Sequence, residues 1–187
     1  MRDAAAAERW DRWFTYLPFA ALAVATVVAM VAGPHIGATT PTARLVAQLV
    51  LPVVVAVWLW WFTVVRPELG RERPWALVYY VVRTVMAFAL TLLNPLFCIF
   101  GWVGYIDADG IFRRNARWVA VGATAVIMAT GQSGGVPTEV GGQAALFAVL
   151  LVVNFGLAGV FSSYGNSMER SNAARAAAIS ELESLNA

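Results

Sequence analysis

Residues 75–117 read WALVYYVVRTVMAFALTLLNPLFCIFGWVGYIDADGIFRRNAR, and this stretch decides the fold. It contains two apolar runs that meet at Asn94-Pro95. This dipeptide favours a tight turn, because the residue before a proline is biased away from the helical conformation. We therefore expect two neighbouring membrane helices, the second turning back along the first.

Both runs carry ionisable groups where lipid should lie, with Arg83 in the first and Asp107 and Asp109 near the end of the second. At about 1.5 Å per residue, Arg83 lies roughly 12 Å from the end of its helix at Trp75. In a hydrocarbon core about 30 Å thick, Asp107 lies about 14 Å from the same side if its helix starts at Leu96. The matching depths predict an Arg83–Asp107 or Arg83–Asp109 ion pair. The alternative is that Arg83 extends its flexible stem to the membrane interface.

The composition is that of a membrane protein. The chain has 187 residues, of which 60% are hydrophobic and 13% are charged, whereas soluble domains are about 45–50% apolar and about 25% charged. All thirteen basic residues are arginines, and with the Ala/Val/Gly bias this favours a bacterial source. The arginines lie at helix ends and do not line one polar surface, so no direct nucleic-acid binding is expected.

Six apolar runs predict an all-α polytopic protein with a six-helix transmembrane bundle. The runs begin near Phe14, Leu45, Trp75, Leu96, Trp118 and Ala144. With both termini in the cytoplasm of a bacterial cell membrane, eleven arginines face inward, only Arg44 faces outward, and Arg83 is buried, as the positive-inside rule requires. The predicted divisions are an interfacial segment at 1–13, the six-span domain at 14–164 and a cytoplasmic exit helix at 165–187.

The last stretch, 162–187, is polar, Ala-rich and helix-favouring. Met168, Ile179 and Leu182 belong to a seam with a spacing of three to four residues, which we interpret as the contact face of a signalling helix. A sustained coiled coil needs at least about three or four heptads, and fewer than three are present. A solvated amphipathic tail therefore remains an equal interpretation.

The sequence contains no evident enzymatic machinery. It has no nucleophile–base set, phosphate-binding loop or HExxH motif, and its single histidine, His35, lies in a loop. No catalytic, cofactor-binding or metal site is therefore predicted. Asn154, in the middle of the sixth run, is expected to form an interhelical hydrogen bond worth about 0.6–2 kcal/mol. The pairs Gly101/Gly104 and Gly156/Gly159 are expected to let helices approach closely.

Three segments carry a family resemblance: LNPLFCIFGWVGYIDADG (93–110), RWVAVGATAVIMATGQSGGVP (117–137) and ERSNAARAAAISELESLN (169–186). Together they resemble the membrane-sensor region of actinobacterial two-component histidine kinases of the NarL/DesK-like class. The resemblance implies a homodimer whose exit helix leads into a kinase core lying outside these 187 residues. Only that core would need ATP and Mg²⁺, and it would act on a cognate response regulator.

The expected function is therefore that of a sensor. A bundle with two nearly equivalent packings would pass a membrane or extracellular stimulus to the helix after the sixth span. The rival interpretation is a self-contained transporter or carrier, with Arg83 and the two aspartates on a proton or substrate path. A membrane-embedded enzyme is a third, weaker alternative.

Overall fold

The computed structural model describes the backbone of residues 2–32, 42–69, 72–112 and 115–161, and the side chains from Thr15 onward within these ranges. Every regular element in these ranges is a helix. The all-α class is therefore confirmed for the described residues. Four helices are long and apolar enough to cross a membrane, at Thr15–Ala32, Thr42–Val65, Arg73–Leu93 and Gly142–Phe161.

The elements follow one another along the chain with short connections. They are α1 (Arg2–Ala32), α2 (Thr42–Trp60) with its π-helical end η2 (Trp61–Val65), α3 (Arg73–Leu93), the 3-10 turn η4 (Pro95–Phe97), α4 (Cys98–Gly101), α5 (Val103–Ile111) and α6 (Asn115–Gln132). A last helix, Gly142–Phe161, follows α6. We call it the edge helix.

Two of the expected boundaries differ from the structure. The segment predicted at 1–13 and the first predicted span share one helix, because α1 is continuous from Arg2 to Ala32 and passes through Pro18. The expected fourth span is divided into η4, α4 and α5. The predicted signalling residues Met168, Ile179 and Leu182 lie outside the described residues.

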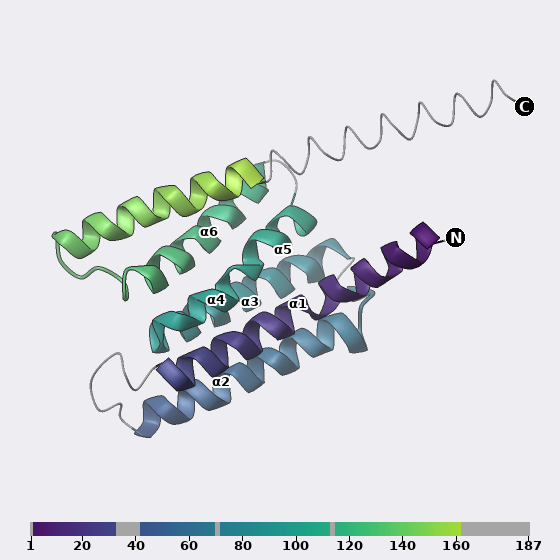
Figure 1. Ribbon diagram of the computed structural model, residues 1–187, viewed down its shortest axis with the longest axis horizontal. Helices are drawn as coiled ribbons and strands as arrows, with labels where there is room; N and C mark the ends of the chain where they lie inside the picture. The colour runs from purple at the N-terminus through teal and green to yellow at the C-terminus, as the bar shows by residue number, and fades with distance from the viewer. Residues whose placement is uncertain (1, 33–41, 70–71, 113–114, 162–187) are drawn as a thin grey trace, which may run out of the picture.

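Figure 1 shows the helices lying lengthwise beside one another, with the edge helix next to α6 on one side and α2 on the opposite side. α3 occupies the middle of the bundle, where it contacts α2, α4, α5 and α6. α1 packs against α2 and α4. Arg83, in the middle of α3, is therefore surrounded by protein and is 1% exposed.

The core is built from small and aromatic side chains on facing helices. Ala25 of α1, Leu59 of α2, Leu90 of α3 and Phe100 of α4 are all fully buried. They belong to one cluster that joins the first five helices and reaches Ile127 of α6. The described residues of the edge helix contribute nothing buried to this core.

Side chains of α2 cap the last carbonyls of α3 at the end of the bundle that holds Asn94. Arg44 Nε donates to the Leu93 carbonyl at 2.9 Å, and Gln48 Nε2 donates to the same oxygen at 3.1 Å. Asn94 Nδ2 donates to the Ala29 carbonyl of α1 at 3.4 Å. These bonds satisfy carbonyls that a helix end leaves without partners, and they fasten α1, α2 and α3 together.

Candidate functional site

The structure brings Arg83 of α3 and Asp107 of α5 together inside the bundle. Arg83 Nε lies 2.9 Å from Asp107 Oδ2, and the two side chains are 1% and 16% exposed. The depth argument from the sequence left Asp107 and Asp109 as alternatives, and the contact is made by Asp107. Arg83 thus does not extend to the interface.

The pair is close but poorly aligned. Although the two atoms are 2.9 Å apart, neither Nε nor Oδ2 has a hydrogen bond of acceptable geometry within the described residues, and Arg83 Nη1 also has none. The Nε–H bond is therefore not directed at the oxygen. A buried ion pair offsets its desolvation only when its geometry is good and its remaining polar atoms are satisfied. This pair meets neither condition fully.

Aromatic rings and a glycine make the space that the guanidinium occupies. The Arg83 Cζ atom lies 5.5 Å from the centre of the Tyr80 ring and 6.0 Å from that of Phe100, distances at which a cation is attracted to a ring face. A Cβ atom on Gly104 would lie 2.9 Å from Arg83 Nη2 and would also collide with Thr124. Only glycine leaves room for the arginine here.

Two tyrosines connect the pair to the neighbouring helices. The Tyr80 hydroxyl donates to the Ala120 carbonyl of α6 at 2.8 Å and lies 3.4 Å from Thr124 Oγ1. The side chain of Tyr79 interacts with Asp107 and packs against Phe62 with a ring-centre distance of 5.5 Å. Through these two tyrosines of α3, the charged pair is linked to α2 and α6.

Asp109 lies on a different side of α5 and has a different partner. Two residues along a helix correspond to a rotation of about 200°, so Asp107 and Asp109 face nearly opposite directions. Asp109 Oδ1 lies 3.3 Å from Arg117 Nη1, and the side chains are 46% and 19% exposed. The Arg117 guanidinium in turn lies 5.4 Å from the Trp118 ring centre. Sequence reasoning missed this second pair.

Asn154 forms the interhelical contact expected of it. Its Nδ2 donates to Gln132 Oε1 of α6 at 2.7 Å and to the Leu150 carbonyl of its own helix at 2.7 Å. Other contacts of the edge helix with α6 involve aromatic rings, with Trp118 and Phe155 at a ring-centre distance of 5.6 Å. The edge helix is therefore attached along one face only.

Three of the four glycines, Gly101, Gly104 and Gly159, lie at close contacts as the sequence predicts, and Gly156 does not. Gly101 and Gly104 do let α4 and α5 approach α6, because a Cβ atom at Gly101 would lie 2.8 Å from Ile127 Cγ2. Gly159 faces Trp118 at 3.3 Å, but a Cβ atom at Gly156 would meet nothing within 4 Å. The tightest helix approach that sequence reasoning missed is at Gly131, which packs against Pro95 and Cys98. No local pattern distinguishes Gly131 from the other loop-proximal glycines.

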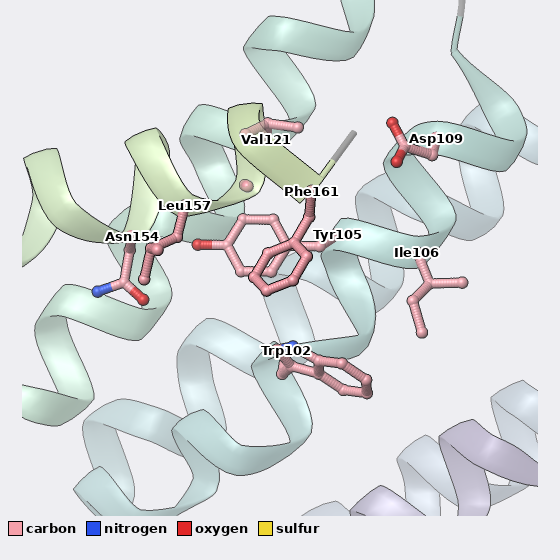
Figure 2. A pocket seen from close by; sticks show the side chains of 9 residues that line it. Trp102, Tyr105, Ile106, Asp109, Val121, Asn154, Leu157 and Phe161 are labelled. Carbon is pink, nitrogen blue, oxygen red and sulfur yellow. The ribbon is translucent and has the colours of Figure 1, made fainter. Parts of the chain in front are cut away.

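A cavity of about 420 Å³ lies between α5, α6 and the edge helix. Figure 2 shows Tyr105 projecting from α5 with its hydroxyl directed toward the side of Asn154 and Leu157, while Asp109 lies farther along α5. The Tyr105 hydroxyl is shielded from solvent and has no hydrogen-bond partner in the described part of the chain. A second hollow of about 510 Å³ lies between α6 and the edge helix and is lined by Gly122 and Phe155 among others.

No family model, curated protein or solved structure matches this chain. Within the described ranges, no group of three or more His, Cys, Asp and Glu residues is arranged to hold a metal ion. The candidate site is therefore defined by its own geometry, which consists of a buried charge pair at the centre and a weakly packed helix with two adjoining hollows at the edge.

Proposed function

We propose that the chain is the membrane-embedded sensor region of a two-component histidine kinase, in which the edge helix transmits the signal. In this proposal the protein spans the bacterial cell membrane six times as a homodimer. The edge helix leads through 162–187 toward a kinase core, which would phosphorylate a cognate response regulator. The family part of the proposal rests on the resemblance of residues 93–110, 117–137 and 169–186.

The weak packing of the edge helix carries the proposal. None of the residues in its membrane-length window is buried, whereas 39% of those in the α3 window are. Two hollows adjoin it. A helix with few buried contacts can shift relative to a packed core at little cost in free energy. It is also the last described element before the polar segment 162–187, so its displacement would be passed along the chain.

The imperfect Arg83–Asp107 pair supports the idea of two packings. A buried pair that leaves N–H groups unsatisfied stabilises one arrangement less than a fully bonded pair would. In the proposal, a second arrangement of α3 against α5 satisfies Nη1 and competes with this one. A stimulus that binds one arrangement better shifts their populations by its difference in affinity.

The transporter alternative finds less support in the cavity beside the edge helix. A transport path would need the charged pair to line a passage. The residues lining the cavity include Asp109, but neither Arg83 nor Asp107. The pair is instead closed off by Tyr80, Phe100 and Gly104.

The six-span arrangement predicts that residues 68 and 139 lie on opposite sides of the membrane. In a Cys98→Ser background in sealed vesicles, we expect a membrane-impermeant maleimide to label Glu68→Cys only from the cytoplasmic side. Glu139→Cys should be labelled only from the outside. Three predicted spans separate the two positions: α3, the fourth span and α6. An odd number of spans places them on opposite sides of the membrane. Val55→Cys, at a fully buried position, is the unreactive control. Labelling of both exposed positions from the same side would disprove the arrangement.

The kinase proposal is tested on the protein that the complete reading frame encodes. We expect a phosphoacceptor histidine and an ATP-binding domain to follow Ala187. We also expect a short bifunctional thiol cross-linker between Gly122→Cys and Phe155→Cys to fix autophosphorylation at one level, whatever the stimulus. These positions face each other, since a Cβ atom on Gly122 would lie 3.7 Å from Phe155 Cε2. Each single variant, treated in the same way, is the control. A stop codon directly after Ala187, or unchanged regulation in the cross-linked protein, would contradict the proposal.

A further inference from the structure

The cavity between α5, α6 and the edge helix has the properties of a ligand site. Its volume of about 420 Å³ falls within the range of about 300–1,000 Å³ that is usual for small-molecule sites. Its walls are mainly apolar, with Trp102, Ile106 and Leu157 among them, and its polar groups are few. Such a combination of an apolar lining and a few placed polar groups is typical of binding sites.

The membrane itself supplies the most abundant candidate to fill this space. Trp102 and Leu157 are 48% and 53% exposed, and Phe161 at the end of the edge helix is 73% exposed. In a bilayer these surfaces face lipid, so the cavity opens toward acyl chains and not toward water. An empty apolar cavity loses the dispersion contacts of its lining, and an acyl chain restores them.

The polar groups of the cavity are arranged to suit the head of a lipid. Asp109 lines the cavity, and its partner Arg117, with N···O 3.3 Å, lies beside it, outside the lining. Tyr105 lies about one helical turn before Asp109 along α5, a rise of about 6 Å, and its hydroxyl is directed toward Asn154 and Leu157, away from Asp109 (Figure 2). This hydroxyl is a donor without a partner among the described residues, and a buried donor without an acceptor is destabilising. The ester carbonyl of a lipid is an acceptor located just below a charged headgroup.

We propose that this cavity binds one acyl chain of a zwitterionic phospholipid, whose headgroup lies at Asp109 and Arg117 and whose ester carbonyl accepts a hydrogen bond from Tyr105. The edge helix admits the acyl chain by a small outward shift. Its lack of buried residues permits this shift. The binding step does not depend on the kinase proposal. A bound lipid would hold the edge helix at a set distance from α5 and α6.

The experiment is a titration of the purified chain in detergent with dioleoyl phosphatidylethanolamine, followed by native mass spectrometry. We expect one lipid to be retained at saturation. Ala158→Phe fills the cavity, since Ala158 is one of its lining residues, and should weaken retention at least tenfold. Tyr105→Phe removes only the hydroxyl and should weaken retention about fivefold, the loss expected for one hydrogen bond.

Val149→Phe is the matched control, because it adds the same ring to a 59% exposed position of the edge helix outside the cavity. It should retain the lipid as the unaltered chain does. The proposal is overturned if the unaltered chain retains no saturable lipid, if Val149→Phe loses it as Ala158→Phe does, or if Tyr105→Phe binds with unchanged affinity. Because the readout is binding alone, these outcomes are separate from any result on phosphorylation.

Discussion

Arg83→Ala is expected to lower the free energy of unfolding by about 3–5 kcal/mol, as is Asp107→Ala, because each leaves a buried charge without its partner. The reason lies in the burial of the pair, whose side chains are 1% and 16% exposed. The double variant should lose clearly less than the sum of the two, since it leaves no unpaired charge behind. Unfolding of the purified protein in mixed micelles, followed by circular dichroism as the denaturing detergent increases, measures all three values.

Arg66→Ala is the matched control for this comparison of the two single variants with the double variant. Arg66 also pairs with a carboxylate, but its side chain and that of Glu68 are 57% and 56% exposed. Exposed pairs contribute about 0–1 kcal/mol, so this variant should unfold almost as the unaltered protein does. If the effects of Arg83→Ala and Asp107→Ala are strictly additive, the two residues do not act as a pair.

Gly131→Ala is expected to destabilise the protein by about 1–3 kcal/mol, the usual effect of forcing extra volume into a packed site. An added Cβ atom at Gly131 would lie 2.6 Å from the Pro95 carbonyl oxygen and would also collide with Cys98. The carbonyl belongs to the backbone of η4, so it cannot rotate away as a side chain can. The same unfolding assay measures the change.

Gly156→Ala is the control substitution, because an added Cβ atom there meets nothing within 4 Å. Gly156 lies within the edge helix, where alanine is favoured over glycine by up to about 1 kcal/mol. This variant should therefore be as stable as the unaltered protein or slightly more stable. A Gly131→Ala protein as stable as Gly156→Ala would show that α6 and η4 are not closely packed.

Residue pattern and helix length were sufficient to predict the helical class and a pair between Arg83 and one of the two aspartates, Asp107 or Asp109. Depth in the membrane follows from sequence position alone, because a helix rises by a fixed amount per residue. The choice between Asp107 and Asp109 did not follow, because it depends on how α5 is rotated about its own axis. That rotation places Gly104 of α5 against Thr124 of α6, which is a tertiary contact.

Other parts of the site depend on which helices are neighbours, and the sequence does not specify this. Nothing local indicates that Gly131 packs against Cys98, or that Arg44 caps the carbonyls of α3. The same is true of the Asp109–Arg117 pair and of the cavity beside Tyr105. Each arises from residues on different helices, so only the assembled bundle reveals it.

The fastening of α1, α2 and α3 has a consequence for how the protein is made. Its hydrogen bonds join Arg44 and Gln48 to Leu93, and Asn94 to Ala29. All of these residues are synthesised before any residue of α5. The first three helices can therefore dock as soon as Asn94 has left the insertion machinery. Asp107 follows Arg83 by 24 residues, which at about 5–20 residues per second takes about 1–5 s. During that interval Arg83 is at the membrane without its partner Asp107. The rate of translation therefore affects whether α3 inserts correctly.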